Sequence, residues 1–322
     1  MNDFRSATAS AVCALMLGLF ASSPCLAEDP APTPTPTPPA ADAAAPASDA
    51  APDAKPAAAA TDHEALAKAS QNPVAAMISI PFENNFYSDV GPSDKHANVL
   101  NIKPVVPVSI SSNWNLINRV ILPVIWMDGQ DSITKGRGNA DLGHLETFPG
   151  TSSKWGLGNT TYQGFLSPKN SGKIIWGVGP AFQFPTNTDD RFGADTWNGG
   201  LAAVALTMPG HWVIGGLVQQ VWSFAKHGDA ADVSSFLLQP FVNYNFGKGW
   251  YVSTAPVITA NWEAGGGETW TVPLGGGIGK VMRFGKGLPP MNFKLAGYYN
   301  VHRPDNAPRW DLQLSVTLMF PK

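Results

Sequence analysis

Residues 310–320 read WDLQLSVTLMF, and the character of the side chains alternates along the whole stretch. Apolar residues occupy the even positions from Trp310 to Phe320, whereas the odd positions begin with Asp311, Gln313 and Ser315. A period of two is typical of a β-strand whose two faces meet different surroundings. Alternation of this length exceeds the needs of most soluble strands and matches a tilted strand that crosses a bilayer.

The same period recurs upstream, most clearly over 233–246 and 250–263. Connections between the segments alternate in length, from short turns such as Gly247–Gly249 to long loops such as 128–155. Short turns at one end and long loops at the other are typical of bacterial outer-membrane barrels. We therefore predict an all-β fold, a closed antiparallel transmembrane β-barrel of about twelve strands with both termini in the periplasm. The expected strands are 75–88, 97–110, 114–127, 156–167, 173–184, 197–208, 211–224, 233–246, 250–263, 269–283, 291–303 and 309–320.

Strand registers can be predicted because directly opposed residues must share a face of the sheet. Centring the last hairpin on its proline-rich loop sets Asn300 opposite Asp311, so that two polar residues face the lumen together. Centring the Gly247–Gly249 turn on its middle residue sets Asn243 opposite Ser253 in the same way. Both registers agree with a polar lumen.

The tryptophans supply a second line of evidence, because they gather at the expected strand ends. Belts of aromatic residues at two levels are typical of the two membrane interfaces. The alternative is ordinary strand-end packing in a soluble β-sandwich. The turn ends carry Trp114, Trp176, Trp212 and Trp250, and the loop ends carry Trp126, Trp155, Trp197, Trp222, Trp262, Trp270 and Trp310.

The N-terminal part of the chain is expected to be a signal peptide at 1–27, followed by a Pro/Ala-rich periplasmic linker at 28–70 and the barrel at 71–322. Residues 11–21 are apolar but too short to span a bilayer, and small residues precede the expected cleavage after Ala27. A lipoprotein anchored at Cys25 is the alternative. Linker composition predicts disordered, extended chain, with two helical turns over 62–69. Both cysteines, Cys13 and Cys25, lie within the expected signal.

Composition excludes several functional classes. The formal net charge is −3 and no dense basic run occurs, which argues against a nucleic-acid partner. The six histidines show no metal-ligand spacing, so neither a metal nor another cofactor is expected. An outer-membrane hydrolase would need a serine and a histidine at the outer rim, where Ser88 and His302 are the nearest candidates. No GxSxG motif occurs, and we expect no catalytic residues.

A small set of ionisable residues falls on lumen-facing positions and forms the candidate site. Two interpretations stay open: a charged constriction that selects solutes, or paired charges that fill a narrow barrel. Centring the first loop near Asp94 predicts that Glu83 and Lys103 are near-opposite, and centring the next turn on Ser112 predicts that Arg119 lies beside Val105. The candidate residues are Glu83, Lys103, Arg119, Lys294 and Asp311.

Prolines inside the expected strands conflict with this fold, because a closed barrel has no edge strand that could dispense with a backbone donor. Bulges could accommodate some of them. These prolines are Pro81, Pro104, Pro107, Pro123, Pro180, Pro240, Pro256 and Pro273.

Several short phrases of the sequence carry a resemblance to a known family. They are WGVGP at 176–180, QPFVNYN at 239–245, TANW at 259–262, WTVPLG at 270–275 and LMFPK at 318–322. In these phrases the chain resembles a family of bacterial outer-membrane barrels, the outer-membrane or transporter proteins of the meta pathway of phenol degradation, which are often mislabelled neuromedin U. The resemblance covers roughly residues 70–322 and implies a twelve-stranded barrel, with no functional residues to carry over.

The function expected from these observations is an outer-membrane pore or transporter for small solutes, including aromatic or moderately apolar compounds. A structural or adhesion barrel with a plugged lumen is the alternative, and an outer-membrane hydrolase is a further one. Expected partners are outer-membrane lipid, the barrel assembly machinery and small solutes.

Overall fold

The computed structural model describes residues 55–91, 93–130, 133–136, 145–148, 150–285 and 287–321. The predicted signal peptide and the linker up to residue 54 lie outside the described residues. The chain divides into two compact units, of which the second, beginning at Ala57, contains the fold described below.

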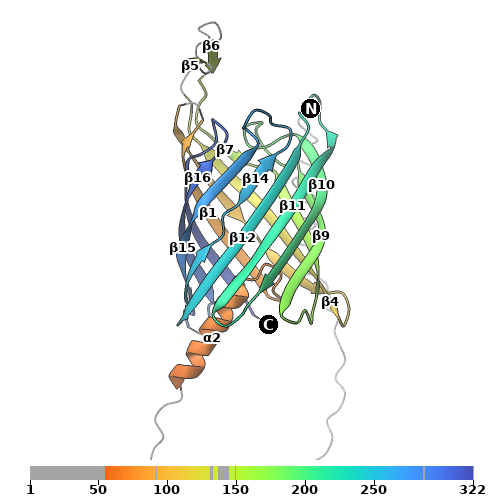
Figure 1. The fold of residues 1–322 in the computed structure, drawn as a ribbon, viewed down its shortest axis with the longest axis vertical. Helices are drawn as coiled ribbons and strands as arrows, with labels where there is room; N and C mark the ends of the chain where they lie inside the picture. Colours follow the sequence, from red (N-terminus) through yellow and green to blue (C-terminus); the bar gives the residue numbers. More distant parts are fainter. Residues whose placement is uncertain are drawn as a thin grey trace, which may run out of the picture. The chain divides into compact units, whose positions relative to one another are not determined.

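Over the described residues, the fold is a closed antiparallel barrel of twelve strands, as predicted (Figure 1). The barrel closes because β1 pairs with β17, from Ile78 opposite Phe320 to Ser88 opposite Trp310. Three of the twelve strands are interrupted and carry two labels each, namely β2–β3, β7–β8 and β13–β14. The wall comprises β1 (Ile78–Val90), β2 (Lys95–Ile102), β3 (Val105–Ser109), β4 (Trp114–Met127), β7 (Lys154–Leu157), β8 (Thr160–Pro168), β9 (Ile174–Phe184), β10 (Thr196–Thr207), β11 (Trp212–Lys226), β12 (Ser234–Gly247), β13 (Trp250–Thr254), β14 (Ile258–Asn261), β15 (Trp270–Met282), β16 (Met291–His302) and β17 (Trp310–Phe320).

Helix α2 and the β5–β6 hairpin are not part of the wall. Helix α2 (Lys55–Ser70) precedes β1 and lies at the end of the barrel where the short turns are found (Figure 1). At the opposite end, β5 (Ile133–Gly136) and β6 (Leu145–Phe148) form a separate hairpin within the longest loop.

The two faces of the wall have the polarity of a lipid-facing barrel, with apolar side chains outside and many polar ones inside. On β17, Leu312 and Leu314 are more than half exposed, whereas Gln313 and Ser315 are buried inside. Most tryptophans are exposed on the outer face near the strand ends, and Trp155 is 74% exposed. In a soluble protein this exposure would be unfavourable, so the surface fits the predicted transmembrane barrel.

Several of the strand prolines coincide with breaks in the wall. Pro104 separates β2 from β3, Pro256 separates β13 from β14, and Pro273 lies next to a bulge at Val301 of the facing strand β16. Other prolines stay within continuous strands, where their carbonyls still accept a bond: Pro123 O accepts from Gly158 N at 2.9 Å. Each proline within a continuous strand therefore removes one donor from the wall while the rest of the ladder continues.

The predicted registers hold in some hairpins and fail in others. Asn243 lies opposite Ser253, and Val105 lies opposite Arg119, as predicted. The last hairpin was predicted wrongly by two residues, because Tyr298, not Asn300, lies opposite Asp311. A shift of two keeps the same face inward, so the polar lumen survives the error.

Helix α2 is longer than the two turns expected over 62–69, and it occupies chain that was predicted to be extended linker. Its sequence, KPAAAATDHEALAKAS, is rich in alanine, the residue with the highest helix propensity. Pro56 lies in the first turn, where a missing backbone donor costs little.

Candidate functional site in the barrel lumen

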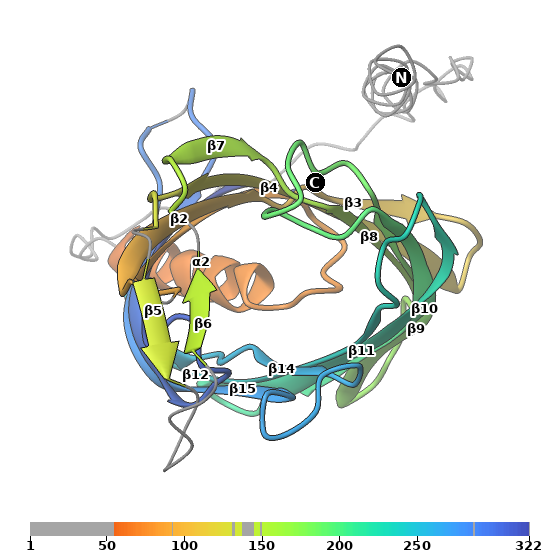
Figure 2. The same cartoon turned by 90° about the horizontal axis from the view of Figure 1, so that it is seen from above.

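The end of the barrel next to the short turns is occupied by residues 66–77, which comprise the last part of α2 and the chain that follows it. We call this segment the plug. Viewed along the barrel, α2 lies within the outline of the wall (Figure 2). Leu66 and Ala67 are buried against Val281 and Met319 on the inner wall, together with Met77.

Polar contacts fix this segment to the wall at several points. Lys68 Nζ donates to Gly210 O at 2.6 Å, in the turn between β10 and β11. Gln71 and Asn245 exchange two side-chain hydrogen bonds at 3.0 and 3.2 Å, and Asn292 Nδ2 donates to Ser70 Oγ at 3.1 Å. Sequence reasoning missed this plug because nothing in a Pro/Ala-rich segment indicates a tertiary partner.

All five candidate residues are carried by β1, β4, β16, β17 or the β2–β3 break, on lumen-facing positions. Lys103 Nζ donates a hydrogen bond to Glu83 Oε1, and both side chains are more than four-fifths buried. Glu83 and Lys103 were predicted to be near-opposite: the direct partner of Glu83 on β2 is Asn101, two residues before Lys103, and the lysine side chain reaches across to the carboxylate. Arg119 and Lys294 also act on the Glu83 carboxylate by charge.

The fifth candidate, Asp311, lies close enough to the other charges to interact with them. It is attracted by the oppositely charged Lys294 and Lys103 and repelled by the like-charged Glu83. The five residues therefore form one charge cluster with three basic and two acidic groups. One excess positive charge follows if every group is ionised. Such a cluster can bias the passage of ions because fixed charges act strongly where water is scarce.

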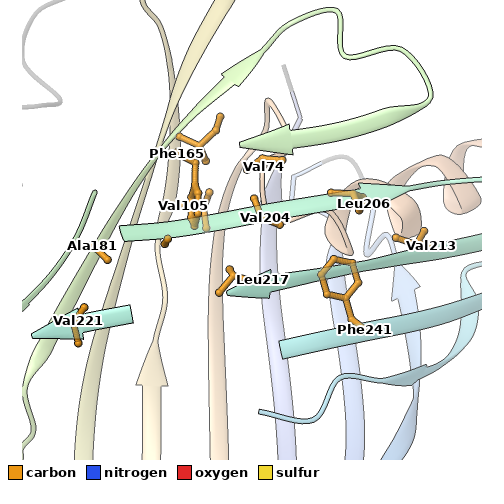
Figure 3. Packing of buried hydrophobic residues seen from close by; sticks show 12 residues of the cluster. Val74, Val105, Phe165, Ala181, Val204, Leu206, Val213, Leu217, Val221 and Phe241 are labelled. Atoms are coloured by element: carbon orange, nitrogen blue, oxygen red, sulfur yellow. The ribbon is translucent and has the colours of Figure 1, made fainter. Parts of the chain in front are cut away.

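An apolar cluster lies on the inner wall, mainly on β8 to β12, and we call it the apolar wall (Figure 3). Inward polar residues such as Gln163 and Gln219 lie among these side chains. On β10, LAAVAL at 201–206 is apolar on both faces. The missing alternation in that stretch was the signal for an apolar inner wall. The cluster consists of Val74, Val105, Ile117, Phe165, Ala181, Ala202, Val204, Leu206, Val213, Leu217, Val221 and Phe241.

A cavity of about 190 Å³ lies between the plug and the charge cluster. Ser70 to Asn72 line one side, Glu83 and Lys103 line another, and Phe241 contributes part of the apolar wall. The cavity is thus lined by polar groups, charged groups and aromatic carbon, and its volume suits a small organic molecule.

The hydrolase alternative is not supported by the geometry of its two candidates. Ser88 lies opposite Trp310 in the register, and Trp310 is half exposed on the outer face. His302 lies beyond the bulge in the β15–β16 pairing and is exposed, and the described chain shows no hydrogen bond between it and Ser88. Among the described residues, no group of three or more His, Cys, Asp or Glu side chains is placed to hold a metal ion. None of the described helices has the length and hydropathy to cross a bilayer.

Comparison with known proteins gives a likeness in fold. No protein-family profile matches the sequence, and no curated protein matches it. An outer-membrane channel from Pseudomonas putida F1 superposes with a TM-score of 0.53 at 16% identity, covering 77% of this chain and 97% of that one. A looser likeness is CymD, a monoaromatic hydrocarbon channel, with a TM-score of 0.41 at 10% identity, covering 76% of this chain and 88% of that one. Another is a FadL homologue from Pseudomonas aeruginosa, with a TM-score of 0.34 at 9% identity, covering 78% of this chain and 93% of that one.

The first likeness supports the barrel architecture, and the other two are too distant to carry an argument. The resemblance to the meta-pathway family stays a prediction.

Proposed function

We propose that the protein is an outer-membrane pore that passes small solutes, including aromatic or moderately apolar compounds. The observation that carries this proposal is the two-sided lumen, in which a charge cluster around Glu83 faces an apolar wall around Phe241 across one cavity. An apolar wall offers favourable contact to a hydrocarbon ring, while the polar wall keeps the lumen hydrated. Lipid outside and the assembly machinery are the proposed partners.

Planar-bilayer recordings of refolded protein test this proposal directly. We expect discrete conductance steps, together with swelling of liposomes in small neutral solutes. A protein that folds by heat-modifiable migration and yet shows neither signal would contradict the pore.

A plugged structural or adhesion barrel is the second candidate, and the packing of α2 and Gln71 inside the wall is the observation that favours it. The two candidates differ in conductance, because a permanently plugged barrel gives background current only.

The proposed location is the outer membrane, with the N-terminal linker, α2 and the C-terminus on the periplasmic side. The hairpin β5–β6 and the β9–β10 loop at 185–195 would then face the outside. A cysteine label should reach residues 186–195 on intact cells and should not reach Lys248. Labelling of Lys248 but not of Lys135 would reverse the orientation.

A further inference from the structure

The wall of the barrel has a gap where β13 passes into β14. Toward β15, pairing stops at Ser253 opposite Gly277 and resumes at Thr259 opposite Thr271. The two ends of the gap share one register, so no residue has been inserted. The segments 254–258 and 272–276 face each other without ladder pairing, and we call them the seam.

The gap also extends toward β12. Pairing there stops at Val242 opposite Thr254 and resumes at Leu238 opposite Ile258, again in one register. Residues 255–257 have therefore left the ladder on both sides. The β2–β3 break also keeps one register, but there Lys103 N still donates to Pro81 O and Pro104 O still accepts from Val120 N.

The sequence prevents the seam from closing. Continuing the register would set Pro256 opposite Leu274 and Pro273 opposite Val257, so each segment contains a residue without a backbone donor. On its other side β15 is packed very close to β16. A Cβ added to Gly275 would lie 2.0 Å from the carbonyl oxygen of Gly297, so only glycine fits there.

The chain at the seam bends inward. Ala255 N donates to the hydroxyl of Tyr298 at 3.4 Å, and Ala255 O accepts from Gln239 Nε2 at 3.4 Å. Tyr298 and Gln239 both occupy inward-facing positions of their strands. Their side chains therefore bond the backbone N–H and C=O of Ala255, which have no partner in the ladder. Across the seam itself, the described chain has one hydrogen bond, from Thr254 Oγ1 to Gly275 O at 2.7 Å.

A cavity lies on each side of this thin wall. The inner one is the lumen cavity, which Gln239, Ser253 and Ala255 line together with the plug. The outer one is a groove of about 770 Å³ in the outer face of the wall, and Ser253 lines it as well. Ser253 therefore lines both the lumen cavity and the outer groove.

Of the described residues that line the outer groove, none has a charged side chain. Trp212 and Tyr244 pack with ring centroids 4.7 Å apart at its edge, beside the exposed Val242 and Val252. Such a lining suits an apolar solute and gives an ion no compensation for its hydration shell.

We propose that the seam is a lateral portal through which small apolar solutes pass between the lumen cavity and the hydrocarbon of the membrane. The proposal rests on the proposed function and names its route. Because α2 and the chain behind it occupy the periplasmic end of the lumen, the seam gives a solute in the cavity a route that avoids that end. One hydrogen bond across the seam is a small barrier to a transient opening.

A disulfide across the seam tests the portal. A Cβ on Gly276 would lie 3.6 Å from Thr254 Cβ, which is within the range that a disulfide requires. The double variant T254C/G276C can therefore be locked by oxidation and released by reductant. The native cysteines both lie in the predicted signal, so they do not interfere.

The readouts are uptake of radiolabelled toluene by cells that express the protein, and ion conductance of the purified protein in planar bilayers. We expect oxidation to reduce protein-dependent toluene uptake to background and reductant to restore it, while ion conductance stays the same. The matched control is A203C/V218C, an outward-facing pair in the regular β10–β11 ladder, whose bridge should leave uptake unchanged.

Wild-type uptake by a fully bridged T254C/G276C protein would refute the portal and leave the pore intact. Ion conductance in wild type without toluene uptake would also refute the portal alone. Absence of both signals in wild type would refute the proposed function and the portal with it.

Should the bridged variant fail to fold, P256V/P273V tests the same idea by restoring both backbone donors. We expect slower amide exchange over 254–258 together with loss of uptake. Slower exchange with undiminished uptake would overturn the portal.

Discussion

Lys103 and Glu83 form an ion pair inside the barrel although their backbones are not opposed in the β1–β2 register. The lysine sits at the break between β2 and β3, where its own backbone N donates to Pro81 O at 2.9 Å. The strand break therefore places a long basic side chain against a buried carboxylate. Arg119 and Lys294 act on the same carboxylate, which makes Glu83 the centre of the cluster.

Removing the basic groups of the cluster should change ion selectivity. We expect K103A/R119A to shift the reversal potential in a salt gradient toward cations, and E83Q to shift it toward anions, because fixed charge in a narrow pore repels ions of its own sign. Reversal potentials from planar-bilayer recordings give the measurement.

A purely structural cluster predicts a different result. Deleting one partner would then leave an unpaired buried charge and destabilise the barrel by about 3–5 kcal/mol, with conductance unchanged. Heat-modifiability gels run beside the recordings separate the two outcomes. Unchanged selectivity and unchanged stability in every variant would contradict both interpretations.

Gly279 provides a test of lumen packing. A Cβ at this position would lie 2.2 Å from Cζ of Tyr251, whose buried ring covers the glycine and whose hydroxyl donates to Asn292 at 2.8 Å. We expect G279A to destabilise the barrel by about 1–3 kcal/mol through overpacking, measured by urea unfolding in detergent. Combining it with Y251A should recover part of that loss, and strictly additive effects would argue against the contact.

Strand number and facing could be predicted from the sequence because the alternation in stretches such as 310–320 directly reports two environments. Register was predictable only where the turn is tight. At the β12–β13 turn, Gly247, Lys248 and Gly249 all have positive φ, and this compact geometry fixes the centre of the hairpin. The last hairpin has a longer loop at 303–309, which leaves its centre ambiguous by two residues.

The apolar inner wall and the plug could not be predicted by the same reasoning. Alternation assigns apolar residues to lipid, but Val213 and Leu217 are apolar and face inward. Helix α2 owes its place to contacts such as Lys68 with Gly210, which join residues far apart in the chain and leave no local pattern. The seam was visible only as an excess of prolines, since its meaning depends on which residue each proline faces.

The β9–β10 loop should lose its order in acid. Hydrogen bonds from Lys154 and from Arg191 hold the pKa of Asp189 well below its usual range. Because the folded pKa is depressed, this stabilisation is complete above the ordinary pKa of about 3.9 and is lost as pH falls through the lower folded value. We expect protease nicking of 185–195 to rise below about pH 4 for wild type, whereas D189N should be nicked at neutral pH.

Its neighbour Asp190 is exposed and serves as the matched control. D190N should behave as wild type at both pH values. Equal nicking of D189N and D190N at neutral pH would show that the Lys154–Asp189–Arg191 contacts do not order the loop.

Deleting residues 57–70 should raise the single-channel conductance several-fold. This deletion removes the half of α2 that is buried against Val281 and Met319, together with the anchor from Lys68 to Gly210. The strands begin only at Ile78, so the wall should still close through β1 and β17. Conductance in planar bilayers, with heat-modifiable migration as the check on folding, provides the measurement.

A deletion of residues 30–54 is the matched control, because it shortens the same N-terminal region and leaves α2 in place. We expect its conductance to equal that of the full chain. If only the deletion of 57–70 opens a current, and wild type gives background, the plugged-barrel alternative is favoured for the resting protein. If the deletion of 57–70 folds and conducts like wild type, α2 does not limit the current, and the constriction must be sought at the charge cluster around Glu83 instead.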